Sequence, residues 1–259
     1  MKFLQALPIC FILLASFSIH AQNRIQLSSE TASKSFSFSD YTAIDVASDF
    51  KVNVGFSTNE ESLVVTANEN LLDRVNIYQK GKTLYFRLEP KTNTRGRMIL
   101  DVELTTAMLH SFVGSSDAII VVKNTIKHNK VDLSLRSDAQ FTGDIEAKSL
   151  RIDASSDAQI NSKVTVKDCD LKAKSDAIIN LDGTIGRLYA SLSSDSQFKN
   201  RNLSIEDVNI KMSGDSQAWI RITNSLEATA SGDSVLKYAG NPRLINRRVT
   251  GDAKIIEVD

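Results

Sequence analysis

The sequence of 259 residues contains few of the groups that metal, redox and disulfide chemistry require, with two cysteines, three histidines and only three prolines. The cysteines and histidines are too far apart to match the spacing of a zinc or redox site, so we predict no metal site and no cofactor. The chain also has no excess charge, with 31 basic and 31 acidic residues. Proteins that bind nucleic acid through their net field are strongly basic, and we therefore expect no nucleic-acid partner.

Long apolar stretches are also scarce, and the one that stands out lies near the N-terminus. Lys2 precedes an apolar run from Leu7 to Phe17, and Ile19-His20-Ala21 follows it. This layout is typical of an export signal, and the run is shorter than the roughly 20 residues that span a bilayer. We therefore predict that residues 1–21 are a signal peptide and that the mature chain has no transmembrane segment.

Removal of this segment would leave Cys169 as the only cysteine, so we expect no internal disulfide. The remaining roughly 238 residues are enough for an ordinary apolar core, which an exported protein without disulfides needs. Residues 22–37 are rich in serine, and we predict that they form a flexible leader. The expected location of the mature chain is the periplasm, the cell surface or the extracellular space.

The second half of the chain repeats a short motif in which Ser or Gly precedes an Asp and Ala or Ser follows it. The motif occurs eight times, and its aspartates are 18 to 21 residues apart. They are Asp117, Asp138, Asp157, Asp176, Asp195, Asp215, Asp233 and Asp252. A period of about 19 residues is typical of an array of similar units that stack on one another.

Within each repeat, apolar and polar residues alternate on both sides of the Asp. Around Asp157, for example, Leu150, Ile152 and Ile160 occupy odd offsets, while the even offsets are mostly polar. Alternation with a period of two indicates a strand with one buried and one solvated face. The small residues beside the Asp favour a tight corner between two strands. We therefore predict an all-β fold, a parallel β-helix or β-solenoid with coils of about 19 residues, in which residues 114–259 form the eight repeats.

Residues 38–113 follow the same plan less regularly. Apolar residues from Ile44 to Val54 alternate around Asp49 with the parity of the later repeats. We predict that this stretch is a divergent N-terminal β part of the same domain. The one segment with helical character is Asn68 to Arg74.

Three features together resemble the bacterial family of putative auto-transporter adhesins with a head GIN domain. They are the export signal, the blocks Ile44–Val52 and Leu63–Leu72, and the eight Asp corners. The resemblance extends from about Phe38 to Val258. It implies a right-handed β-helix, a location at the outside of Gram-negative bacteria of the Bacteroidetes type, and a role in adhesion without a catalytic set. One departure is that early corners read Ser-Ser-Asp or Arg-Ser-Asp where the family often has Gly-Ser-Gly, which leaves glycine-dependent corner geometry open.

The corner aspartates are the first candidate site. By parity they point outward, and stacked coils would place them in a file about 4.8 Å apart. One interpretation is structural, because an Asp at a turn can accept hydrogen bonds from backbone amides. A stripe that binds divalent cations and a direct ligand surface are the alternatives, although no second acidic residue recurs at a fixed offset, as a calcium site would require.

A polar stripe two residues after the corners is the second candidate site. It contains Gln140, Gln159, Gln197 and Gln217, and Trp219 follows two positions later. Rows of amide side chains can hydrogen-bond sugar hydroxyls, and Trp219, Tyr189 and Tyr238 are candidate platforms for a sugar ring. The alternative is an ordinary solvated sheet face.

Two further residue types are interpreted as structural. Cys169 lies on an inward column, which predicts a buried and inert thiol. His110 lies on the same column and His128 in a return loop, and neither has a recurrent acidic or nucleophilic partner for a catalytic dyad.

These observations predict a non-enzymatic exported β-solenoid that presents a rigid polar face for cell adhesion or for binding a glycan or another cell-surface partner. One alternative is a periplasmic sensor or scaffold in envelope-stress signalling. Another is a polysaccharide lyase or hydrolase, which needs Asp and Arg or Lys to converge in one groove. Arg243, Arg247 and Arg248 are predicted to give the last coil a polar end, and solenoid ends also favour homo-oligomers formed by end stacking.

Overall fold

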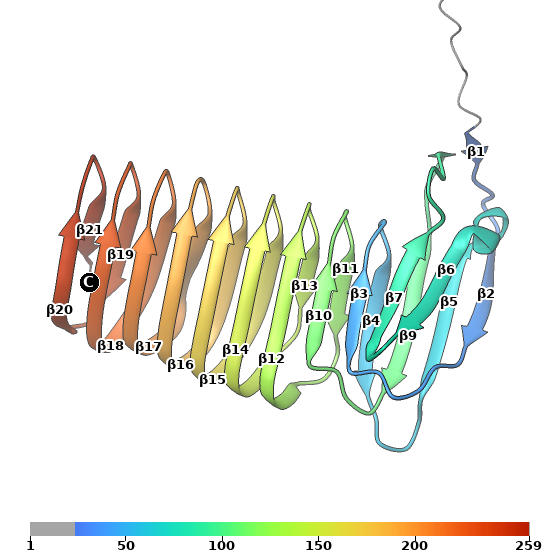
Figure 1. The fold of residues 1–259 in the computed structure, drawn as a ribbon, viewed down its shortest axis with the longest axis horizontal. Helices are drawn as coiled ribbons and strands as arrows, with labels where there is room; N and C mark the ends of the chain where they lie inside the picture. Colours follow the sequence, from blue (N-terminus) through green and yellow to red (C-terminus); the bar gives the residue numbers. More distant parts are fainter. Residues whose placement is uncertain (1–23, 259) are drawn as a thin grey trace, which may run out of the picture.

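The structure, a computed structural model, describes residues 24–258, so the predicted signal peptide of residues 1–21 lies outside the described part. The described residues form a long row of β-coils with a less regular group of strands at the N-terminal end (Figure 1). Helix is confined, within this part of the chain, to the short 3-10 helix η1 (Glu69–Arg74), where the sequence predicted it. The predicted all-β fold is confirmed.

The larger part of the molecule is a stack of coils that pair in parallel, one repeat apart. Leu150 lies beside Cys169, and Cys169 lies beside Leu188. The strands are β10 (Ser111–Gly114), β11 (Ile119–Val122), β12 (Ile126–Arg136), β13 (Gln140–Thr142), β14 (Ile145–Ser155), β15 (Gln159–Lys174), β16 (Ile178–Ser193), β17 (Gln197–Met212), β18 (Gln217–Ala230), β19 (Val235–Ala239), β20 (Arg243–Val249) and β21 (Lys254–Glu257). This arrangement confirms the predicted parallel β-solenoid with coils of about 19 residues.

The interior of the stack is built from the apolar columns that the alternation predicts. Leu150, Cys169 and Leu188 are each at most 1% exposed. Phe112 and Phe141, in adjacent coils, pack edge to face with 5.4 Å between their ring centroids. A fully buried Leu, Ile or Phe side chain contributes about 1.5–3 kcal/mol relative to an exposed one. Each coil therefore gains most of its stability from the coils that cover it on either side.

The corners of the early coils are type I′ turns. At Ser116 and Asp117 φ is 54° and 62°, and the same pair of positive values occurs at Ser137 and Asp138. Positive φ at both central residues defines this turn, and Asp tolerates the left-handed conformation better than most residues. Ser-Asp is therefore sufficient for these corners without glycine.

The corners of the late coils are different. From Ser194 onward φ is positive at the first corner position but not at the Asp, the pattern of a type II′ turn, which favours glycine first. Gly214, Gly232 and Gly251 fill that position, and a Cβ on Gly214 would lie 3.0 Å from the backbone nitrogen of Ser194. The change from Ser-Asp to Gly-Asp along the sequence thus follows a change in turn type.

The corner peptide also reverses its direction between these two groups. The amide of Asp138 donates a hydrogen bond of 3.0 Å to the carbonyl of Ser156 in the following coil. The amide of Asp233 instead donates to the carbonyl of Gly214 in the preceding coil, at 3.1 Å. Types I′ and II′ differ by a flip of the central peptide, so the reversed hydrogen bonds agree with the dihedral angles.

The regular coil that adjoins β10 and β11 is formed by residues 43–56, which precede them by a long stretch of chain. β3 (Ala43–Val46) pairs in parallel with β10, and β4 (Lys51–Phe56) pairs in parallel with β11. Ser48 and Asp49 form its corner, with φ values of 64° and 61°. The chain then leaves the stack and rejoins it at Ser111. Residues 38–113, predicted as one divergent β part, therefore contain a regular coil followed by an excursion.

Strands from this excursion and from the start of the described chain close the N-terminal end of the stack. They are β1 (Ile25–Gln26), β2 (Thr31–Phe36), β5 (Ser62–Asn68), β6 (Val75–Lys80), β7 (Thr83–Leu88), β8 (Thr94–Arg95) and β9 (Leu100–Thr106). β7 and β9 continue the stack in parallel beside β3 and β4. β6 then pairs antiparallel with β7, and β5 and β2 add antiparallel strands beyond β9. We call residues 24–42 and 57–110 the end cap.

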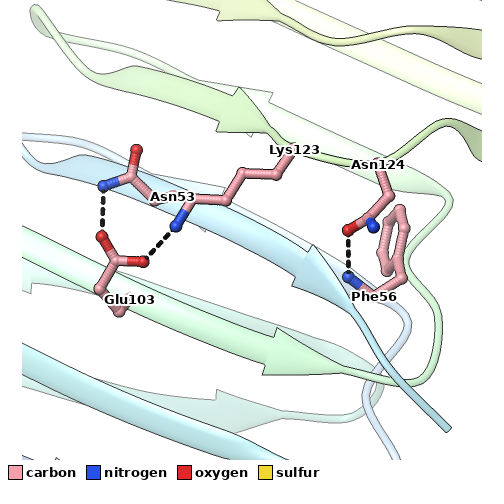
Figure 2. Close-up of polar contacts among 5 residues, drawn as sticks. All are labelled: Asn53, Phe56, Glu103, Lys123 and Asn124. Carbon is pink, nitrogen blue, oxygen red and sulfur yellow. Dashed lines mark hydrogen bonds and ion pairs between the residues drawn. The ribbon is translucent and has the colours of Figure 1, made fainter.

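Polar side chains tie the end cap to the first coils (Figure 2). Glu103 of β9 accepts hydrogen bonds from Asn53 of β4, at 2.8 Å, and from Lys123, which follows β11, at 2.7 Å. The backbone amide of Phe56 donates to the side chain of Asn124 at 2.8 Å. These contacts join three successive layers and fix the point at which the chain leaves the stack.

The prediction of a flexible leader over residues 22–37 is wrong for the residues that the structure describes. β2 pairs with β5 along its whole length, from Thr31 to Phe36. Just before it, Asn70 accepts a hydrogen bond from the amide of Ser28 at 3.0 Å and donates to the carbonyl of Gln26 at 2.8 Å. The many serines suit an edge strand with mostly exposed side chains, and composition alone does not distinguish such a strand from a loop.

Candidate functional site

The eight corner aspartates all lie on the tight turns along one edge of the stack (Figure 1). All eight are exposed, as their outward parity predicts. Asp49 precedes them in the same file, and burial, followed by the charge of Asp117, raises its pKa. Within residues 24–258 no group of three His, Cys, Asp or Glu side chains is arranged to hold a metal ion. The structural interpretation of this file and its two alternatives stay predictions.

The predicted glutamine stripe is divided into two pairs by the structure. Gln140 lies beside Gln159, and Gln197 lies beside Gln217. Ile178 separates the two pairs, because it lies beside both Gln159 and Gln197. These residues lie on the strands that follow the corners, and we call this surface the post-corner face.

A hollow opens on the post-corner face next to the second pair of glutamines. Its volume is about 380 Å³, and we call it the Trp219 hollow. Lys199, Asn200, Gln217, Ala218, Trp219, Val235 and Lys237 line it. Trp219 is partly exposed, and the buried Ala218 and Ile220 on either side show that its indole points outward. The structure thus brings Gln217 and Trp219 together at one concave place, while Gln140 and Gln159 lie on other coils.

The hollow exists because β17 contains extra residues at this point. Lys199 pairs with Trp219 and Ser204 with Arg221, so five steps along β17 match only two steps along β18. Asn200 and Asn202 lie in this stretch, and Asn200 accepts a hydrogen bond of 2.9 Å from the amide of Asn202. A β-bulge of this kind redirects side chains locally and often lies beside a functional site. Asn200, which lies in the inserted stretch, thereby forms part of the wall of the Trp219 hollow.

Sequence reasoning missed Lys199 and Lys237, which pair with Trp219 from the preceding and the following strand. One signal was present in the spacing of the corners. The step from Asp195 to Asp215 is 20 residues, whereas the next step, to Asp233, is 18. A local departure from the period marks the insertion that builds the hollow.

The other two aromatic candidates, Tyr238 and Tyr189, differ in exposure. Tyr238 is only 5% exposed, so the hypothesis that it is a sugar platform is wrong. Its ring fills an inward position, and its hydroxyl points to Glu257 at 3.5 Å. Tyr189 is 53% exposed and lies in β16 before the next corner, away from the glutamines.

The remaining reactive side chains are placed as follows. Cys169 is fully buried, and burial raises the pKa of its thiol to about 12. His110 and His128 stack with 4.3 Å between ring centroids, and His128 belongs to β12, not to a return loop as predicted. Burial and then the neighbouring His128 lower the pKa of His110.

Three other hollows in the described part of the chain combine acidic and basic groups, and two of them include Lys127 with Glu146 and Arg187 with Asp207, respectively. The third has a volume of about 210 Å³ on the strands before the corners, and its lining includes Asp132, Arg151 and Asp153. Asp132 forms an ion pair with Lys130 at 3.3 Å. Among these hollows, the third brings two Asp and one Arg into one lining, the combination that the lyase or hydrolase alternative requires.

Within the described residues, no helix has the length and apolar character of a membrane span. The fold and its surface define a class: a parallel β-solenoid with one closed end and exposed polar columns. The family model for putative auto-transporter adhesins with a head GIN domain matches residues 40–242, and the chain belongs to this family. No curated protein matches the sequence.

Several solved structures share this fold. A putative adhesin from Parabacteroides merdae is 20% identical, with a TM-score of 0.84 over 91% of this chain and 99% of that one. A putative lipid binding protein from Parabacteroides distasonis is 17% identical, with a TM-score of 0.84 over 92% of this chain and 100% of that one. A putative adhesin from Bacteroides fragilis is 16% identical, with a TM-score of 0.69, over 90% and 100%. At such identities the likeness shows a shared fold.

Proposed function

We propose that the protein is an exported, non-enzymatic adhesin that binds glycans of a cell surface through its post-corner face. The observation that supports this most directly is the Trp219 hollow, in which an outward indole lies beside the amide groups of Gln217 and Asn200. A pocket with an apolar platform and a few convergent polar groups is typical of a small-ligand site. Membership of the adhesin family and the predicted signal peptide support the exported and adhesive parts of the proposal.

The solenoid suits this role because the hollow sits on a stiff base. Ala218 and Ile220, which flank Trp219, are buried in the core and at most 2% exposed. Parallel pairing on both sides, to β17 and β19, holds the strand that bears the indole. A preorganised surface loses little conformational entropy when a ligand binds.

The experiment compares the wild-type chain with Trp219→Ala in glycan binding and in adhesion of cells that express it. We expect Trp219→Ala to abolish both, because the ring platform is removed from a surface position that contributes little to the core. Tyr189→Ala is the matched control, since Tyr189 is an exposed aromatic outside the hollow. Equal loss in both variants, or no loss in either, would contradict the proposal. Protease shaving of intact cells tests surface location, and protection of the protein would favour the periplasmic sensor or scaffold instead.

The enzyme alternative can be tested at the hollow that contains Asp132, Arg151 and Asp153. Turnover of a polysaccharide by the wild-type chain that disappears in Asp153→Asn would favour a lyase or hydrolase. The adhesin proposal expects no turnover in either protein. The adhesin family and the adhesin-like structural neighbours suggest a non-enzymatic protein.

The C-terminal end of the stack supports the proposal of homo-oligomers by end stacking. Leu244 and Ile245 are 50% and 59% exposed. Each strand of this last coil pairs on one side only within the described chain, β20 with β18 and β21 with β19. Arg243, Arg247 and Arg248 of the same strand are also exposed, which is consistent with the prediction that they give this end polar surface. Sedimentation of the wild type and of Ile245→Lys tests the idea, which expects a dimer for the former and a monomer for the latter.

A further inference from the structure

Trp219 is surrounded by basic side chains. Lys199 and Lys237 flank the indole on the neighbouring strands. Arg221 lies two residues further along β18, and Lys254 pairs with Val235 at the rim. All four side chains are exposed. A cluster of positive charge therefore surrounds the hollow on a chain whose formal net charge is zero.

This part of the face also lacks acidic residues. The segments 197–204, 217–223 and 235–241, which run side by side here, contain four Lys or Arg residues and no Asp or Glu. Lys254 lies beside them in β21, and the one acidic residue of that strand, Glu257, accepts a hydrogen bond from the hydroxyl of Tyr238 at 3.5 Å. Elsewhere an exposed cation can find a carboxylate, as Lys123 does with Glu103 at 2.7 Å. The four cations at the hollow form no ion pair within residues 24–258, and Lys199 donates a hydrogen bond to Gln197 at 3.1 Å.

The corners that precede these strands carry carboxylates. Asp215 and Asp233 lie two residues before Gln217 and Val235, which line the hollow. They repel an anion from the corner side of the indole. An anion is therefore better placed on the other side of the indole, toward Arg221, and a concave wall with apolar parts strengthens the attraction.

We propose that the Trp219 hollow selects sugars that bear an anionic group, with the sugar ring on the indole and the anion held by Lys199 and Lys237. This inference rests on the proposed function, because it specifies the ligand of the same site. Each lysine is one strand spacing, about 4.8 Å, from the strand of Trp219, so both ammonium groups can reach a ligand above the ring. Hydrogen bonds between an ammonium and a carboxylate or sulfate are roughly twice as strong as neutral ones.

The test measures binding of three probes to the chain without its signal peptide. An oligogalacturonate supplies carboxylates, a heparin-derived oligosaccharide supplies sulfates, and maltohexaose is neutral. We expect at least one anionic probe to bind about tenfold more tightly than maltohexaose, and its affinity to fall as salt screens the charges. Comparison of the two anionic probes identifies which anion the site prefers.

The decisive variant is Lys199→Gln combined with Lys237→Gln. We expect it to weaken binding of the anionic probe about tenfold and to leave maltohexaose unchanged. Lys172→Gln combined with Lys174→Gln removes the same charge from exposed positions before the corner at Asp176, and should behave like the wild type. Thermal unfolding of all variants checks that they fold.

The outcomes separate this inference from the function on which it rests. If maltohexaose binds as tightly as both anionic probes, or if the Lys199 and Lys237 variant binds them like the wild type, the preference for anions is overturned and the glycan site remains. If none of the probes binds, or if Trp219→Ala binds them all normally, the glycan site itself is wrong, and the preference falls with it.

Discussion

The apolar interior of a coil is covered in different ways in the stack and in the end cap. In the stack each coil is covered by another coil of the same design, so one set of columns serves for all of them. At the end cap the repetition stops, and the antiparallel strands β2, β5 and β6 close the sheets. Here side-chain hydrogen bonds hold the chain in place: Asn68 donates to the carbonyl of Ser28, and Asn70 donates to the carbonyl of Gln26.

Glycine shows the difference most plainly. Gly183 in the stack has φ of +103°, and a Cβ there would lie 2.2 Å from the carbonyl oxygen of Val164 in the neighbouring coil. Gly81, in the hairpin between β6 and β7 of the end cap, has φ of +59° and nothing within 4 Å of its Cβ position. The stack needs glycine because coils press on each other, whereas the hairpin needs it only for backbone conformation.

The largest effect is expected when the glycine that contacts a neighbouring coil is replaced. Gly183→Ala should destabilise the protein by about 3 kcal/mol or more, because the added methyl forces the backbone away from Val164 in addition to the unfavourable φ. Gly81→Ala should cost about 1 kcal/mol, the usual penalty for a left-handed residue with a side chain. Urea unfolding of the two variants measures both values, and equal costs would show that the contact between coils is unimportant.

A smaller effect is expected from the buried asparagine of the end cap. Asn68 is 1% exposed, donates to the carbonyls of Ser28 and Arg97 at 2.8 and 3.1 Å, and accepts from the amide of Ile99 at 2.8 Å. Asn68→Ala leaves these groups without partners, and we expect a loss of about 2 kcal/mol, with proteolysis starting near residues 24–36.

The matched substitution in the stack is Ser162→Ala. Ser162 makes one hydrogen bond, to the carbonyl of Gly143 at 2.7 Å, and its loss should cost about 1 kcal/mol without exposing the N-terminal segment. Proteolysis at the same rate in both variants would contradict the view that Asn68 secures the end cap.

The smallest effect concerns pH at the junction of the two regions, where His110 from the end cap stacks on His128 from the stack. Burial, then the charge of His128, lowers the pKa of His110. The folded state then binds fewer protons than the unfolded state just below the usual pKa of about 6.5, so stability declines as pH falls through that window. His110→Gln should show a weaker decline. NMR titration of His110 at or above the usual pKa would refute this account.

Much of the stack could be predicted because its signal is repeated. Eight corners and the alternation around them predict the parallel coils and the burial of Cys169. The end cap offers each signal once. The sequence predicted a flexible leader where the strand Thr31–Phe36 lies. Its serines are the exposed side chains of a strand, and composition alone does not distinguish them from those of a disordered segment.

The candidate site was predicted only in part. Gln217 and Trp219 were selected by their offset from the corner, and they do line a hollow. Tyr238 was assigned to the surface although it is buried, and the lysines beside Trp219 were not noticed. Neighbours across strands are separated by a whole repeat in the chain, so a reading that follows one strand at a time does not show them.

The amino-acid sequence by itself determined the period, the inward and outward columns and the places where the chain turns, since these depend on side-chain size and polarity at regular intervals. Only the tertiary structure decided that β4, which ends at Phe56, lies beside β11, how the corner peptides are oriented and where the surface is hollow. Those features arise from contacts between residues distant in the chain, and a local insertion such as that in β17 changes them without altering the pattern on either side.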